Sequence, residues 1–220
     1  MKALRFTVSR YHGSDRLASV LLTAPWCRDS NRPLVHDDDR IACVVGCMLL
    51  LELYFDGNIG VDAGGRIRPV GTTSDDDPAL KDLLTAIRGA LPPRPALSWL
   101  HYLTQQHRAI TMVWQRLVDA GVAAPAEKRR WRSRPRRVMT ELLATAWAPH
   151  YLSRNVTVDD AIPQPAIALW HGLKALRLDA RALEMDLAIG QRLDATPLPA
   201  ELQPLFSALN TTLARLATPL

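Results

Sequence analysis

The feature that most constrains the fold is an apolar run at residues 41–55, with the sequence IACVVGCMLLLELYF. Glu52 is the one charged residue within it. A membrane-spanning helix needs about 18 or more uncharged apolar residues, so the run predicts a buried core helix and no anchor. We expect this helix to begin near Arg40, after the acidic residues 37–39, and to end with Gly57 as its cap.

The rest of the chain has mostly helical periodicity. Segments 58–61 and 66–70 flank an Ala-Gly-Gly turn and predict a β-hairpin. Asp77 and Pro78 are typical of a helix start, and the proline-rich segment 90–95 ends that helix. Further helices are predicted at 17–24, 96–105, 108–120, 137–147, 166–178, 180–193 and 200–217, with loops at 25–39 and 149–165.

The fold class predicted by this pattern is mainly α, because no βαβ alternation is present. We expect one compact helical domain with a small β-hairpin at residues 17–220, preceded by a polar, basic N-terminal arm at 1–16. The length of 220 residues suits one domain, and 48% hydrophobic residues with 22% charged residues exclude disorder of the whole chain.

Cysteine usage and motif searches restrict the function. The odd count of three cysteines, without a CxxC, predicts a reduced, cytoplasmic protein with no metal or redox site. Nucleotide-binding glycine motifs, nucleophile elbows and metal-binding histidine motifs are absent from the sequence. We therefore expect neither an enzyme nor a bound cofactor. We expect Glu52 to lie at a partly exposed or hydrogen-bonded end of its helix.

Positive charge is concentrated in one segment. The net charge is +5, and residues 128–137, KRRWRSRPRR, contain seven basic residues in ten. Such a segment is typical of three situations: a solvated loop, contact with anionic lipid, or contact with nucleic acid, in which Trp131 stacks on bases.

Several segments resemble the Golgi phosphoprotein 3 family. GCMLLLELYFDGNIGV at 46–61 is similar to the family's apolar helix, Glu-Leu turn and short strand. Four further segments resemble the family in the same order and spacing, namely 75–87, 93–103, 114–122 and 165–178. The resemblance covers about residues 17–217. It implies a helical domain that binds membranes at their surface, with no catalytic residues.

The same resemblance implies a lipid pocket that this chain does not retain. Eukaryotic members bind phosphatidylinositol 4-phosphate through a tryptophan and several arginines. The tryptophan position is His36 here, and the arginine positions are Val45, His107 and Ile110, with Arg108 as the nearest guanidinium. The family's aliphatic hairpin is replaced by the arginine-rich segment.

The sequence thus predicts a cytoplasmic peripheral membrane protein that binds anionic phospholipid or a membrane surface, with a protein partner possible and no transmembrane segment. A nucleic-acid-binding or protein-adaptor module using the same segment is the alternative. The predicted lipid-binding residues are Arg129, Arg130, Trp131, Arg132, Arg134, Arg136, Arg108, His107 and His36.

Overall fold

The computed structural model describes residues 16–27, 29–62, 64–71, 77–126, 137–156, 161–182 and 187–217. The protein is mainly α-helical, as predicted. Its helices are α1 (Leu17–Thr23), α2 (Asp38–Phe55), α3 (Pro78–Arg88), α4 (Ala96–Thr104), α5 (Arg108–Asp119), α6 (Trp147–Asn155), α7 (Gln164–Ala175), α8 (Asp179–Ala182), α9 (Leu187–Ala195) and α10 (Gln203–Ala217), with 3-10 turns η1 (Gln105–His107) and η2 (Leu142–Ala146). Its strands are β1 (Trp26–Cys27), β2 (Arg32–Pro33), β3 (Ile59–Val61), β4 (Arg66–Pro69) and β5 (Arg94–Pro95).

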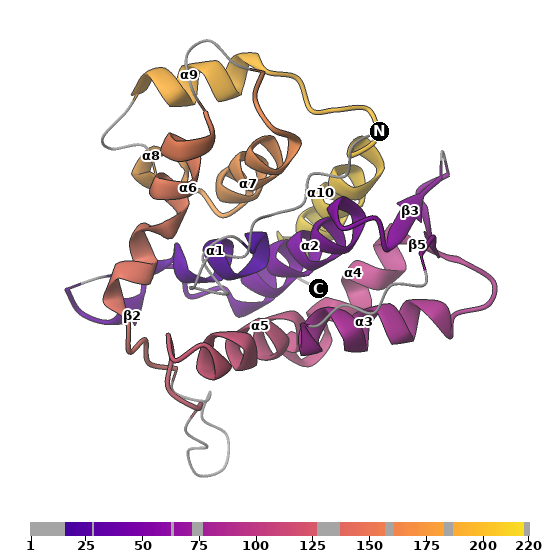
Figure 1. Cartoon of the computed structure of the whole chain (residues 1–220), viewed down its shortest axis with the longest axis horizontal. Coiled ribbons are helices and arrows are strands. Elements are labelled where there is room, and N and C mark those ends of the chain that lie inside the picture. The colour runs from indigo at the N-terminus through magenta and orange to yellow at the C-terminus, as the bar shows by residue number, and fades with distance from the viewer. Residues whose placement is uncertain are drawn as a thin grey trace.

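Helix α2 is the centre of the fold. It packs against α1, α4, α5, α7 and α10. Every residue from Ile41 to Leu53 is buried, which explains why the helix has almost no polar face. In Figure 1, α7, α8 and α9 lie above α2, α3 and α5 lie below it, and the sheet β3–β5 lies at the right-hand end. Within the described ranges, no helix is long and apolar enough to cross a membrane.

Both predicted ends of α2 are confirmed. The Asp37 carboxylate caps the start by accepting a hydrogen bond of 2.9 Å from the Arg40 amide. Gly57, at φ +73°, closes the other end with an amide that donates to the Tyr54 carbonyl at 3.0 Å. Glycine suits this position because side chains disfavour positive φ.

The predicted hairpin is confirmed and belongs to a three-stranded antiparallel sheet, in the order β3-β4-β5. In its turn, the Asp62 carboxylate accepts hydrogen bonds of 2.9 Å from the amides of Gly64 and Arg66. The third strand was not predicted. Arg94 and Pro95 pair with β4 across the chain, and a two-residue strand leaves no periodic pattern in the sequence.

Two predictions in the middle of the chain are wrong. Residues 137–147 are not a continuous helix, since Met139 forms a β-bridge with Ala123 and only η2 and the start of α6 follow. The loop predicted at 149–165 contains most of α6. Pro149 occupies the third position of that helix, where no helical hydrogen bond from its nitrogen is needed, so it does not end the helix.

The segment predicted as a loop at 25–39 contains the short antiparallel pair β1–β2. Asn31, in the turn between these strands, has φ 49°. Towards the C-terminus, the helix predicted at 180–193 corresponds to α8 and α9, between which residues 183–186 lie outside the described residues.

The buried apolar side chains of the described residues form one core cluster that draws on helices from α1 to α10. Cys43 and Cys47 belong to this core as free thiols. Burial raises the pKa of Cys43 to about 11 and that of Cys47 further, so both stay protonated at neutral pH. The division into an arm at 1–16 and a domain at 17–220 stays a prediction, because residues 1–15 lie outside the described residues.

Candidate functional site

The two ends of the basic segment are held together on the domain. The Ala124 amide donates to the Val138 carbonyl at 2.9 Å, next to the bridge between Ala123 and Met139. Asn31 fixes this bridge from the β1–β2 turn. Its side-chain amide donates to the Met139 carbonyl at 2.8 Å, and its side-chain oxygen accepts from the Met139 amide at 3.2 Å.

A buried tryptophan also fixes the residues before the basic segment. Trp114 of α5 packs against Trp26 of β1, with ring centroids 5.5 Å apart. Its indole N–H donates to the Ala124 carbonyl at 3.0 Å. The residues that precede and follow the basic segment therefore emerge from the core at one fixed point, which we call the loop base: Asn31, Trp114, Ala123, Ala124, Val138 and Met139.

Most of the predicted lipid-binding residues lie outside the described residues, namely Arg129, Arg130, Trp131, Arg132, Arg134 and Arg136. Arg137, the last cation of the segment, is described and half-buried at the loop base.

His107 and Arg108 lie at the start of α5, whereas Ala123 and Ala124 of the loop base follow its end. Twelve helical residues span about 18 Å, so the structure does not bring these two residues next to the point where the basic segment leaves the domain. His107 Nε2 lies 3.0 Å from Asp39 Oδ1, which connects the starts of α5 and α2. The Arg108 guanidinium stacks on the Tyr102 ring, 4.0 Å from its centroid, and donates a hydrogen bond to its hydroxyl.

The remaining positions of the family's lipid pocket are Val45, Ile110 and His36. Val45 and Ile110 are 0% and 1% exposed and belong to the apolar core. His36 is exposed in the segment that leads into α2. Gln106 and His107 both adopt left-handed backbone conformations, at φ 54° and 52°, so the connection between α4 and α5 is strained.

The sequence did not predict a buried ion cluster that Arg116 of α5 forms with Glu52 and Asp77. The Arg116 guanidinium is 6% exposed and lies 3.0 Å from Glu52 Oε2 and 2.6 Å from Asp77 Oδ2. Glu52 Oε1 also accepts the Ala18 amide at 2.8 Å, and Arg116 donates to the Ser19 hydroxyl at 3.3 Å. The expectation of a hydrogen-bonded Glu52 is confirmed, but its position is buried.

This cluster connects α1, α2, α5 and the cap of α3. Burial raises the pKa of Glu52 above its ordinary value, and the Arg116 guanidinium opposes that shift. The one available sequence signal was the position of Arg116, three residues after the buried Val113 on the inner face of α5. We assign the cluster a structural role, because all its charged groups face one another.

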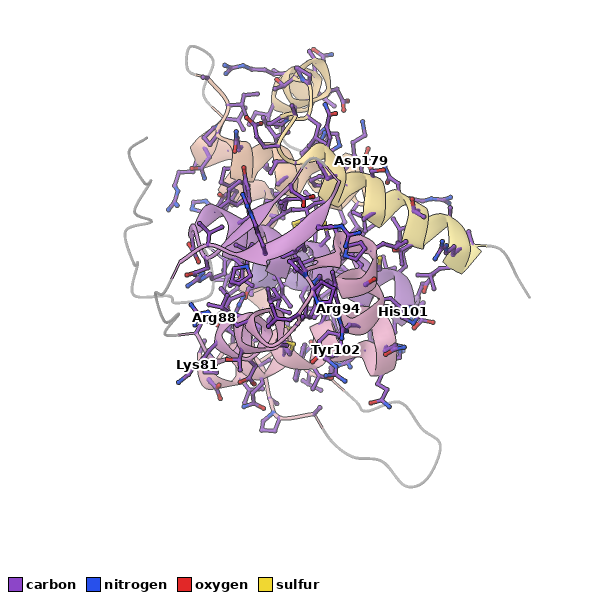
Figure 2. The ribbon with its side chains drawn as sticks, turned by 90° about the vertical axis from the view of Figure 1, so that its right-hand side faces the viewer. Lys81, Arg88, Arg94, His101, Tyr102 and Asp179 are labelled. Carbon is purple, nitrogen blue, oxygen red and sulfur yellow. The ribbon has the colours of Figure 1, made fainter. Side chains whose placement is uncertain are left out.

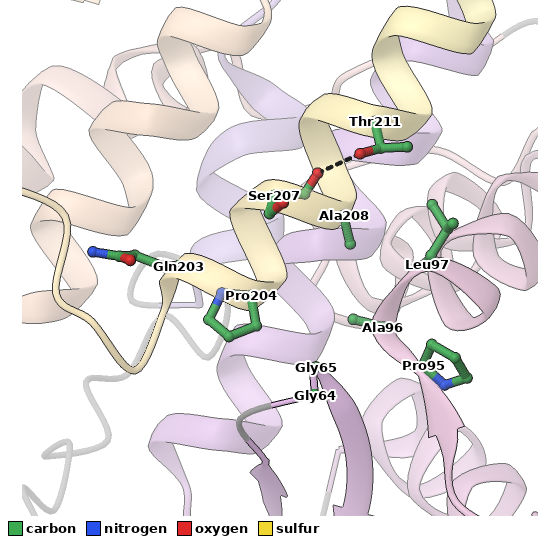
Figure 3. Close-up of a pocket in the computed structure, with 10 residues that line it drawn as sticks. All are labelled: Gly64, Gly65, Pro95, Ala96, Leu97, Gln203, Pro204, Ser207, Ala208 and Thr211. Atoms are coloured by element: carbon green, nitrogen blue, oxygen red, sulfur yellow. Dashed lines mark hydrogen bonds between the residues drawn. The ribbon is translucent and has the colours of Figure 1, made fainter.

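A groove of about 430 Å³ lies between the β3–β4 turn, the start of α4 and α10 (Figure 3). Its lining residues are Gly64, Gly65, Pro95, Ala96, Leu97, Gln203, Pro204, Ser207, Ala208 and Thr211. None of these described residues is charged, and the Thr211 hydroxyl is already bound to the Ser207 carbonyl at 2.9 Å. The groove therefore contains no side chain suited to acid–base chemistry.

Together, the buried central helix and the helices around it define a mainly helical domain, and the loop base is the point where the basic segment 128–137 is connected to it. Among the described side chains, no three His, Cys, Asp or Glu residues are placed to hold a metal ion. A family model described as Golgi phosphoprotein 3 (GPP34) matches residues 18–215. The chain belongs to the Golgi phosphoprotein 3 family, as its sequence resemblance predicted. A search of curated proteins found no match.

Proposed function

We propose that this protein binds anionic membrane surfaces peripherally, from the cytoplasmic side, and that the basic segment 128–137 with Trp131 makes the main contact. The observation that carries the proposal is the loop base. It holds Ala124 and Val138 next to each other, and the chain between them carries seven cations in the ten residues 128–137. Family membership supports a role at a membrane.

The expected binding energy is electrostatic with one apolar contribution. Each lysine or arginine close to an anionic leaflet contributes about 1 kcal/mol, and tryptophan favours the headgroup region. Because Val45 and Ile110 are apolar and buried, we expect the membrane charge, and not the phosphatidylinositol 4-phosphate headgroup, to control binding.

The test is sedimentation with phosphatidylcholine vesicles that contain increasing amounts of phosphatidylserine. A variant with Arg130→Glu, Arg132→Glu and Arg134→Glu should lose about 100-fold or more in affinity, since three contacts of about 1 kcal/mol each are removed. Binding should also weaken with salt.

A control variant with the same change in net charge carries Arg177→Glu, Arg181→Glu and Arg215→Glu, all of which are exposed elsewhere. It should bind vesicles like the wild type. If both variants lose the same vesicle affinity, binding depends on the net charge of the protein and not on the basic segment. Vesicles with phosphatidylinositol 4-phosphate, matched in total charge, should bind no more tightly than those with phosphatidylserine. A gel shift with DNA or RNA, without vesicle binding, would overturn the proposal.

A further inference from the structure

A second surface of the described molecule combines exposed cations with exposed aliphatic side chains. Alternate residues of a strand point to the same side. Arg66 and Arg68 of β4 and the following Val70, whose amide donates to the Asn58 carbonyl at 3.0 Å, therefore share the face opposite the buried Ile67. Val70 is 63% exposed. Gly60 lies opposite Arg68 on β3, and a Cβ there would approach a Val70 methyl group at 2.9 Å, so the absence of a side chain makes room for Val70.

Leu91 lies at the same end of the sheet and is 87% exposed. Leu91 follows Arg88 by three residues in the connection from α3 to β5. Arg88, the last residue of α3, connects that helix to this end of the sheet, because its guanidinium donates a hydrogen bond of 2.9 Å to the Gly71 carbonyl. We call Arg66, Arg68, Val70, Arg88 and Leu91 the sheet-end surface.

Several cations lie at this end among the described residues. Lys81, Arg88 and Arg94 lie on the side of the molecule that faces the viewer in Figure 2. Within the part of the chain that the structure describes, Arg66, Arg68 and Arg94 form no ion pair with a carboxylate. Asp62, the nearby acid of the β3–β4 turn, is bound to its own turn amides.

We propose that the sheet-end surface is a second contact with the anionic bilayer, separate from the loop base. Guanidinium groups suit lipid phosphates, and the Leu91 and Val70 side chains can enter the acyl boundary, where aliphatic groups leave water. A nucleic acid offers phosphates but no comparable apolar layer for aliphatic side chains. The proposal rests on the proposed membrane function and adds a second region to it.

The two contacts lie at different places on the molecule. The loop base includes Asn31 of the β1–β2 turn. In Figure 1, β2 lies at the left-hand end of the long axis and the sheet β3–β5 at the right-hand end. A bilayer contact at the sheet end can therefore be measured independently of the loop.

The test places an environment-sensitive fluorophore on Leu91→Cys in a Cys27→Ser background, since Cys43 and Cys47 are buried. With vesicles of phosphatidylcholine and phosphatidylserine, emission should shift to the blue as the probe leaves water. The matched control is the same label on Leu187→Cys of α9, which is 78% exposed and should show no shift.

An affinity measurement completes the test. The double variant Arg68→Glu and Leu91→Glu should bind these vesicles on the order of tenfold more weakly. Its control, Arg181→Glu and Leu187→Glu, makes the same exchanges on α8 and α9 and should bind like the wild type. All four side chains are exposed, so folding should be retained, and circular dichroism checks this.

The outcomes separate the two proposals. If the wild type binds no vesicles, the proposed function fails. If the wild type binds but the Leu91 probe stays in water and the double variant binds normally, only the sheet-end contact is overturned. Binding of an acidic protein at this surface without any probe shift on vesicles would also overturn it.

Discussion

Arg116 shows how one residue can hold several elements together. Its guanidinium lies between the carboxylates of Glu52 and Asp77, and these come from the end of α2 and the cap of α3. A buried ion pair adds little net stability relative to apolar residues of the same size, but removing one member leaves an uncompensated charge. The cluster therefore makes the arrangement of α2, α3 and α5 sensitive to single substitutions.

We predict that Arg116→Ala lowers the free energy of unfolding by about 3–5 kcal/mol, because Glu52 then remains buried without its main partner. Urea denaturation followed by circular dichroism measures this change.

The double variant Arg116→Met and Glu52→Leu provides the control, since it removes the buried Arg116–Glu52 pair and keeps apolar volume, while Asp77 still accepts hydrogen bonds from the amides at the start of α3. It should be less destabilised than Arg116→Ala alone. A double variant that loses as much stability as the sum of the single variants Arg116→Met and Glu52→Leu would show that the pair does not interact.

At the scale of elements, the crossing of α2 and α4 depends on Gly46. A Cβ at this position would lie 3.0 Å from the Leu103 Cβ and 3.6 Å from the Ala109 Cβ. The family-like segment 46–61 thus begins with a residue whose small size lets two helices approach closely.

We predict that Gly46→Ala destabilises the protein by about 1 kcal/mol. Alanine gains about 1 kcal/mol of helix propensity, but overpacking a core contact costs about 1–3 kcal/mol, and the backbone-proximal Leu103 Cβ cannot turn away. Thermal unfolding measures the difference. Gly89→Ala, whose Cβ would have ordinary contacts from 3.6 Å, should stay close to the wild type, and an equal effect at both glycines would contradict this account.

Elements that carry their own pattern could be predicted from the sequence. The helix α2, its caps and the β3–β4 hairpin depend on residues close together in the chain, and these predictions are confirmed. The strands β1, β2 and β5 have two residues each, which is too short for a periodic pattern. They are defined only by their pairing, β1 with β2 and β5 with β4. The candidate site divides in the same way. The segment 128–137 is evident from composition, whereas the contact of Asn31 with Met139 spans 108 positions and has no local signal.

At the scale of the whole molecule, stability should depend on pH through His171. Its ring lies in α7 against Phe206 of α10, with centroids 5.4 Å apart. Burial lowers the pKa of His171, Lys174 adds to this effect, and Asp194 opposes it. The folded state thus disfavours the imidazolium.

We predict that the free energy of unfolding falls as the pH drops below about 6.5, the ordinary pKa of histidine, because the unfolded chain takes up the proton first. The loss ends once the pH passes below the folded pKa. His171→Phe should reduce this dependence, and His150→Gln, at an exposed site, should not. Urea midpoints between pH 7.5 and 5 measure it, and parallel curves for the wild type and His171→Phe would refute the assignment.

The loop base also bears on how proteins of this design diversify. Because Ala124 and Val138 are held next to each other by backbone pairing and by Asn31, the intervening residues can change in number and kind with little cost to the core. Doubling the length of a flexible connection costs only about 0.6 kcal/mol of closure entropy. The segment between these two residues can therefore differ in length and charge among proteins that share the same helical core.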